Sequence, residues 1–322
     1  MSSSIDIDLD APGRQTGLVR IDSVSTPIHC LARGDGPTLL LTAGVHGDEY
    51  EGQVALAELA RDLDIGEVSG RVIILPMANG PACLAGERRT PIDGLNLNRA
   101  FPGKADGGFT SRLAHFIETE LHARADYAAD FHGGGAILHF LPSTLFVVTE
   151  DEAANRRRRD LAQAFGARYV MLFGAKTMGV EISIDAGMIR QDVVGISGEF
   201  GGSAEITPAA LALCRDGVRR LLAHLGIVAR PAPPLAAGPA QLIDVRPDDC
   251  YLLAESEGLF EPLAQLGDFV RSGAPVARMH RPDRPGDMPT VMHARRDGLV
   301  MARRPLAKSS PGDWLLIIGQ PV

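Results

Sequence analysis

Apolar stretches with the character of buried strands alternate along this chain with segments of helical periodicity. The stretch TLLLTAGV at residues 38–45 precedes a helical pattern over residues 51–63, and RVIILPMAN begins at Arg71. This alternation is typical of crossover units, in which a helix connects two parallel strands of one sheet. The sequence therefore predicts an α/β fold with a mixed, mostly parallel sheet that is flanked by helices.

The pattern continues to about residue 226 and then changes. Further strands are expected at 127–131, from 145, at 167–174 and at 193–200, and further helices at 110–125, 152–165 and 208–226. In ARPAPPLAAGPA, proline and alanine replace any periodic pattern, and short strand-like pieces follow between Gly and Pro turns. We therefore expect a main α/β domain over residues 1–228, a Pro/Ala-rich linker over 229–240, and a smaller C-terminal β-rich domain over 241–322.

Charge and hydropathy argue against several classes of partner. The formal net charge is −8, and the one basic run, at 156–159, fits an exposed helix face. A nucleic-acid or anionic-membrane surface is therefore not expected. The chain has no run of eighteen apolar residues and no signal-peptide pattern at its N-terminus, so we expect a cytoplasmic protein. A homo-oligomer is compatible with its size, but one sequence identifies no interface.

The first candidate site, AGVHGDEYEG, follows the first buried strand. Ligands of open α/β sheets bind at the carboxyl ends of strands, and the three-residue spacing lets His46 and Glu49 converge on one cation. That spacing alone is weak evidence, but His132 follows another predicted strand in YAADFHGGG. Two His and one Glu form a ligand set of catalytic zinc, which lowers the pKa of water toward about 7. The alternative for His132 is a histidine without a ligand role at a glycine-rich turn.

A second candidate site is the loop IDGLNLNRAFPG, whose Asn and Gly content is that of a loop. Arg99 suits a bidentate clamp on a substrate carboxylate, and Asn98 would fix its orientation. In the structural alternative, Asn98 caps the loop and Arg99 pairs with Asp93.

Three further positions complete the candidate chemistry. Arg88 or the adjacent Arg89 would polarise a scissile carbonyl and hold the developing oxyanion. Glu199, in GISGEFGG, ends an apolar strand and would serve as general base toward water and then protonate the leaving amine. Its alternative is a strand-end carboxylate that meets solvent. Asp130 either orients a metal ligand through a contact outside the metal's own ligand shell or caps the turn.

The motifs HGDE, NLNRAFPG, DFHGG and GEFGG, in this order, resemble the succinylglutamate desuccinylase/aspartoacylase family, which is related to zinc carboxypeptidases. The resemblance covers about residues 37–226, and the β-rich tail is similar to the domain appended in that family. The longer stretches GDEYEG and TPIDGLNLNR look most similar to bacterial deacetylases that act on N-acetyl-diaminobutyrate.

The resemblance implies roles at matching positions and one zinc ion per chain. It implies zinc ligands at His46, Glu49 and His132, substrate-carboxylate binding by Asn98 and Arg99, a catalytic carboxylate at Glu199, and carbonyl polarisation by Arg88. The neighbouring Arg89 leaves the last assignment open.

We therefore expect a zinc-dependent amidohydrolase that removes an N-acetyl or N-succinyl group from a small N-acyl amino acid. Two alternatives stay open: a metallocarboxypeptidase that acts on peptides, and a non-catalytic homologue that binds a small acid. A C-terminal domain that covers the cleft would admit only small molecules. The sequence does not identify the acyl group or the amino acid.

Overall fold

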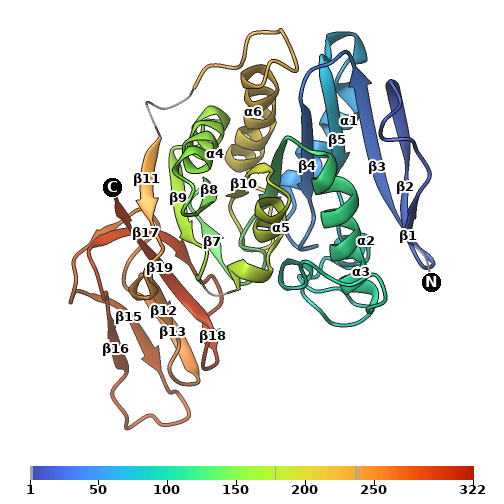
Figure 1. Ribbon diagram of the computed structural model, residues 1–322. Coiled ribbons are helices and arrows are strands. Elements are labelled where there is room, and N and C mark those ends of the chain that lie inside the picture. Colours follow the sequence, from blue (N-terminus) through green and yellow to red (C-terminus); the bar gives the residue numbers. More distant parts are fainter. Residues whose placement is uncertain (1–2, 178, 236–237, 239) are drawn as a thin grey trace.

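The computed structural model describes residues 3–177, 179–235, 238 and 240–322. It contains one large mixed sheet with helices on both faces and further strands at its C-terminal end (Figure 1). The predicted α/β class, with a β-rich C-terminal part, is confirmed. Positions 236, 237 and 239 of the expected linker lie outside the described residues, and the division into two domains stays a prediction.

The middle of the sheet places three carboxyl-terminal strand ends side by side. Its strands, in spatial order, are β3 (Val24–Arg33), β5 (Gly70–Leu75), β4 (Thr38–Ala43), β6 (Tyr127–His132), β10 (Val194–Glu199), β8 (Ser143–Val148) and β9 (Tyr169–Gly174). The run from β5 through β4 and β6 to β10 is parallel, and so is the pair β8–β9. The pair β10–β8 is antiparallel. The ends of β4, β6 and β10 therefore form the kind of crevice where α/β proteins bind ligands.

The N-terminal edge of the sheet was not predicted. There β1 (Ser3–Ile5), β2 (Gly13–Ile21) and β3 form an antiparallel extension of the sheet. Much of β2 alternates between exposed and partly buried residues, so it lacks the apolar run that marks the central strands.

The helices cover the two faces of the sheet and create two cores. Leu39 and Leu41 of β4 pack in a core with residues of α1 (Glu51–Asp62), α4 (Glu152–Phe165) and α6 (Pro208–His224). Leu40 points to the other face, where α3 (Phe109–Phe116) and α5 (Ile184–Arg190) pack. Each fully buried leucine contributes about 2 kcal/mol relative to an exposed one.

The remaining helical segments are short. They are α2 (Gly80–Ala85), the 3-10 turns η1 (Ile65–Glu67), η2 (Leu97–Arg99), η4 (His122–Arg124), η5 (Val180–Ile182) and η6 (Asp248–Cys250), and the π-helical segment η3 (Ile117–Leu121). The helix expected over residues 110–125 is thus built from α3, η3 and η4 in succession. None of the described helices is long and apolar enough to cross a bilayer.

The C-terminal strands continue the large sheet and add a second one. The large sheet includes β11 (Gln241–Asp244), β19 (Trp314–Pro321), β17 (Gly298–Arg303), β14 (Phe269–Val270), β12 (Tyr251–Leu253) and β7 (His139–Phe140). The second sheet contains β16 (Thr290–His293), β15 (Pro275–His280), β13 (Gly258–Pro262) and β18 (Lys308–Ser309). Hydrogen-bonded pairs β9–β11 and β7–β17 connect the C-terminal strands to the strands that carry the candidate site.

Candidate active site

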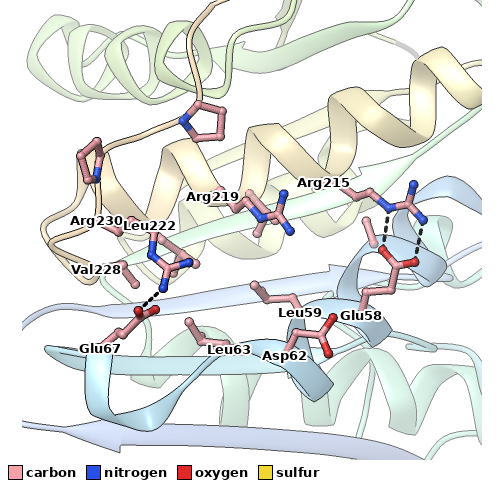
Figure 2. Close-up of a pocket in the computed structure, with 14 residues that line it drawn as sticks. Glu58, Leu59, Asp62, Leu63, Glu67, Arg215, Arg219, Leu222, Val228 and Arg230 are labelled. Atoms are coloured by element: carbon pink, nitrogen blue, oxygen red, sulfur yellow. Dashed lines mark hydrogen bonds and ion pairs between the residues drawn. The ribbon is translucent and has the colours of Figure 1, made fainter.

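Two cavities contain many charged side chains. A cavity of about 480 Å³ lies between α1 and α6 (Figure 2), where Glu58 pairs with Arg215 and Glu67 pairs with Arg230. A smaller cavity, of about 230 Å³, lies at the carboxyl ends of the central strands and is lined by His46, His132 and Glu199, among others. We call the second one the site cavity.

The turn after β4 delivers the first candidate ligands. Gly44 has a φ of 72°, a left-handed conformation that favours glycine, and a Cβ there would lie 2.6 Å from the Sγ atom of Cys83. The chain then passes His46 and Glu49 before α1 begins at Glu51. Both side chains are buried.

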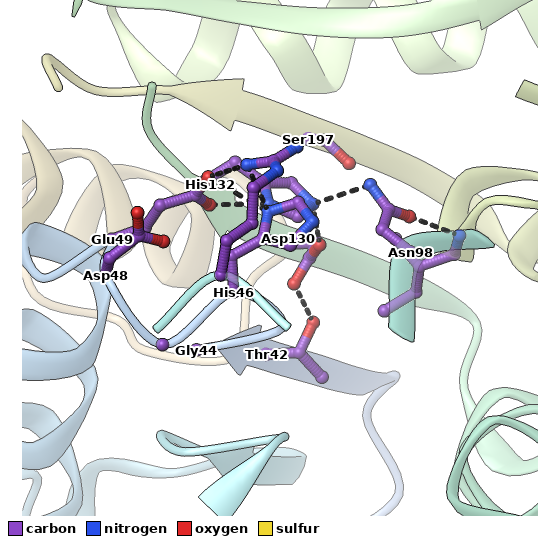
Figure 3. Close-up of polar contacts among 12 residues, drawn as sticks. Thr42, Gly44, His46, Asp48, Glu49, Asn98, Asp130, His132 and Ser197 are labelled. Atoms are coloured by element: carbon purple, nitrogen blue, oxygen red, sulfur yellow. Dashed lines mark hydrogen bonds and ion pairs between the residues drawn. The ribbon is translucent and has the colours of Figure 1, made fainter. Parts of the chain in front are cut away.

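His46, Glu49 and His132 converge as predicted (Figure 3). Nδ1 of His46 lies 2.9 Å from Oε1 of Glu49, and Nδ1 of His132 lies 2.9 Å from Oε2 of the same carboxylate. One potential ligand atom from each residue lies within 4.8 Å of the others. Two imidazoles and a carboxylate at this spacing match the donor set of a zinc site.

Polar partners behind the cluster fix the two imidazole rings. Oδ1 of Asn96 lies 3.0 Å from Nε2 of His46, and Oδ2 of Asp130 lies 2.6 Å from Nε2 of His132. The hydroxyl of Thr42 donates to Oδ1 of Asp130 at 2.6 Å. These contacts turn each Nδ1 toward Glu49, as expected for histidines that bind a metal through Nδ1. Asp130 thus lies within ion-pair distance of His132, as the orienting alternative requires, and that role stays a prediction.

The charges of the cluster also fit a cation. Burial lowers the pKa of His46. Burial would raise the pKa of Glu49, but His46 and His132 hold it below its usual value. Burial would lower the pKa of His132, but Asp130 and Glu49 raise it well above its usual value. An ionised carboxylate and a neutral imidazole can ligate a metal at once, whereas His132 must release a proton when it does so.

Arg88, not Arg89, enters the site cavity. Nη1 of Arg88 lies 2.9 Å from Oε1 of Glu49 and 3.2 Å from Nδ1 of His46. Arg88 is half-buried and lines the cavity, whereas Arg89 is exposed and does not line it. A guanidinium group is thus available beside the cluster, and it comes from the first of the two candidates.

Glu199 lies beside the cluster, on the strand next to that of His132. It ends β10 and pairs in register with His132 on the parallel strand β6. Its Oε2 atom is buried and has no hydrogen-bond partner among the described residues. Burial, followed by the negative charge of Glu49, raises the pKa of Glu199 to about 8. This carboxyl group therefore faces the site cavity rather than bulk solvent.

Asn98 and Arg99 line the same cavity. Oδ1 of Asn98 accepts a hydrogen bond of 2.9 Å from a backbone N–H at the start of α5. Arg99 is exposed, and its Nη1 donates to the backbone oxygen of Asn98 at 2.6 Å. Asp93 instead accepts hydrogen bonds from the backbone N–H and hydroxyl of Thr110. The alternative Arg99–Asp93 pair is thus not formed.

Several residues of the site were missed by the sequence analysis. Asn96 stands in the Asn-rich loop that was singled out, but its contact with His46 depends on the folded loop. Asp185 and Trp314 also line the site cavity and belong to no recognised motif, and Ser197, which lies within GISGEFGG, was given no role. Trp314 comes from β19, so the C-terminal strands supply part of the cavity wall.

A family model for the succinylglutamate desuccinylase/aspartoacylase catalytic domain matches residues 35–225. The matched segment contains the three residues of the cluster together with Arg88, Asn98, Arg99 and Glu199.

Full-length relatives and solved structures are similar to this chain. An N-alpha-acetyl-L-2,4-diaminobutyric acid deacetylase of Halomonas elongata is 37% identical and aligns over 99% of this chain and 95% of its own. The product-bound ectoine utilization protein EutE (DoeB) of Ruegeria pomeroyi has a TM-score of 0.91 at 36% identity, covering 99% of this chain and 98% of its own. A succinylglutamate desuccinylase/aspartoacylase of Rhodobacter sphaeroides has a TM-score of 0.92 at 34% identity, covering 99% of each chain.

Proposed function

The chain belongs to the succinylglutamate desuccinylase/aspartoacylase family, and on that premise we propose that it is a zinc-dependent deacylase of small N-acyl amino acids. The observation that carries the proposal is the position of Glu199. Its unpartnered carboxyl group lines the same cavity as the cluster of His46, Glu49 and His132. A potential metal site and a potential general base thus border one small space.

The cluster would hold the zinc ion, and Glu199 would move the proton. A bound zinc ion would supply Lewis-acid activation of water and of the acyl carbonyl. Glu199 would take a proton from the attacking water and pass it to the leaving amine. Burial and the charge of Glu49 raise the pKa of Glu199, and the positive charge of a bound zinc ion would lower it again, as a general base at neutral pH requires.

The cationic side chains would bind the two ends of the substrate. Arg88 lies beside the cluster, where it would hold the negative charge that develops on the acyl oxygen. Arg99 is exposed and donates to a backbone oxygen, so its guanidinium retains donors for a substrate carboxylate. Asn98 has its carbonyl oxygen engaged by α5, and its amide nitrogen lies 3.4 Å from Nε2 of His132, which leaves one amide N–H to assist.

N-acetyl-diaminobutyrate is the first substrate to test, because the Halomonas relative is similar over nearly the full length of both chains. The wall that Trp314 and Ile317 contribute supports a small substrate over a peptide. The presence of Glu199 argues against a non-catalytic homologue. The cytoplasmic location and a homo-oligomeric state stay predictions.

The direct test is amine release by the zinc-loaded protein. We would assay N-acetyl-diaminobutyrate, N-acetylaspartate, succinylglutamate and a peptide with a free C-terminus. Release from at least one N-acyl amino acid is expected, with loss after chelation and recovery on addition of zinc. Release from the peptide alone would move the assignment to a carboxypeptidase. No release from any compound would favour the non-catalytic alternative.

The ligand set has its own test. His132→Ala should lose bound zinc and, with it, amine release, because only His46 and Glu49 would remain as ligands. His224→Ala, at the exposed end of α6, is the matched control and should keep both. Full zinc content in His132→Ala would show that the third ligand lies elsewhere.

A further inference from the structure

A second carboxylate in the site cavity is not used by the proposed reaction. Asp185 stands in the first turn of α5, is half-buried and lines the cavity. The hydroxyl of Ser197 donates to its Oδ1 atom at 2.6 Å, and the hydroxyl of Ser183 reaches Oδ2 at 3.4 Å. Among the residues that the structure describes, its hydrogen-bond partners are neutral, and the positive charges of His132 and Arg99 act on it without a direct ion pair.

Stability of α5 does not account for this arrangement. Ser183 already caps the helix, since its hydroxyl accepts from the backbone N–H of Ala186. An acidic residue in the first turn gains a modest interaction with the helix dipole, which it could make while facing solvent. Instead, Asp185 turns toward Ser197 on β10, and burial raises its pKa. Because its hydrogen-bond partners are neutral, the desolvation cost of this carboxylate is only partly offset by the more distant charges of His132 and Arg99.

The position of Ser197 places this carboxylate close to the reaction centre. Ser197 and Glu199 are two residues apart on β10, so their side chains leave the same face of the sheet. Asp185 is therefore anchored to a residue two positions from the proposed general base. Arg99, from the loop after α2, lines the same cavity and offers the opposite charge. The cavity thus presents a cation for a substrate carboxylate and an anion whose hydrogen-bond partners among the described residues are neutral hydroxyls.

We propose that Asp185 binds a side-chain ammonium group of the substrate, so that the site selects N-acyl diamino acids over neutral and acidic N-acyl amino acids. This inference rests on the proposed deacylase function. The ammonium would give Asp185 a directly bonded counter-charge, in a cavity whose wall of Val147, Phe173 and Trp314 suits the methylene groups between the charges. A neutral isostere would leave the carboxylate unpaired, which is how a polar site rejects an analogue.

The test compares two substrates of the same shape. N-acetyl-diaminobutyrate and N-acetylnorvaline differ in whether the side chain ends in an ammonium or a methyl group. The zinc-loaded protein should hydrolyse the first with kcat/KM roughly 10- to 100-fold higher, the value of one hydrogen bond between charged groups. Asp185→Asn should lose most of that factor on the diamino acid and leave kcat/KM for N-acetylnorvaline within about threefold.

A matched control distinguishes the loss of a direct contact with the substrate from the loss of one negative charge elsewhere on the protein. Glu181→Gln removes a negative charge four residues earlier, at an exposed position that does not line the site cavity. It should leave the ratio of the two kcat/KM values within about twofold of the wild-type ratio, because exposed charges interact weakly. An equal loss on both substrates in Asp185→Asn would overturn the proposal and assign Asp185 a structural role.

If Asp185→Asn does not fold, the preference for a side-chain ammonium can be tested on the wild-type protein. Calorimetric titration should show that 2,4-diaminobutyrate binds at least about tenfold more tightly than norvaline. Equal affinity, or equal hydrolysis of the two N-acetyl compounds, would overturn the inference while leaving the deacylase proposal intact. Hydrolysis of neither compound, nor of any other N-acyl amino acid, would instead contradict the proposed function.

Discussion

The two charged cavities differ in how their carboxylates are satisfied. In the cavity between α1 and α6, Glu58 accepts two hydrogen bonds of 2.6 Å from Arg215, and Glu67 pairs with Arg230 (Figure 2). In the site cavity, and among the described residues, Glu199 has a buried oxygen without a hydrogen-bond partner, and the side chain of Asp185 is hydrogen-bonded only to serine hydroxyls. Glu58 and Glu67 in the larger cavity thus each have an arginine partner. Among the described residues, Glu199 and Asp185 in the smaller cavity form no such ion pair.

Whether the carboxylates of a cavity are paired indicates its function better than the volume of the cavity does. Paired side chains at a helix–helix groove stabilise the structure that is already present. Carboxylates buried without counter-ions reduce stability, and folded proteins keep such features mainly where a ligand or a reaction needs them. The smaller cavity is therefore the candidate active site, although the other has about twice its volume.

The largest expected effect is that of Glu199→Gln. Loss of the proton shuttle should lower kcat by about 10²- to 10⁴-fold while zinc content stays near the wild-type value. Glu58→Gln makes the same chemical change in the other cavity and should leave kcat within about twofold. The measurements are steady-state kinetics and metal analysis on both variants. Loss of zinc from Glu199→Gln would make Glu199 a ligand, and equal kinetic losses would remove the distinction between the cavities.

A smaller effect, on zinc affinity, is expected for Asp130→Asn. This variant tests whether the contact between Asp130 and His132 stabilises the proposed metal site. Oδ2 of Asp130 lies 2.6 Å from Nε2 of His132, and replacing an outer partner of this kind typically weakens metal binding by about 10- to 100-fold. Competition with a chromophoric chelator measures the affinity. Asp160→Asn, at an exposed position of α4, is the control. Unchanged zinc affinity in Asp130→Asn would mean that Asp130 does not orient this ligand.

The sequence predicted the parts of the molecule whose signals are local. The apolar runs of β4 and β6 marked buried strands, and the residues after them, His46 and His132, fell where parallel strands end. The alternating strand β2 gave no such signal. Asp185 was missed because its side chain is positioned by a hydrogen bond with Ser197, which comes from a different element. Trp314 was missed for a related reason, since only the pairing of C-terminal strands with the large sheet places it at the site cavity.

The smallest expected effect belongs to the ion pair between Glu58 and Arg215. The two side chains keep 29% and 39% of their surface accessible, so solvent screens their attraction and each must be held in one rotamer. We expect Glu58→Gln, Arg215→Gln and the double variant each to lower the melting temperature by no more than about 3 °C. Thermal unfolding of the four proteins gives the coupling between the two residues, and the deacylase assay on the same samples tests their function. A large loss of amine release without a loss of stability would show that the groove between α1 and α6 takes part in activity, and paired charges would then no longer mark a cavity as structural.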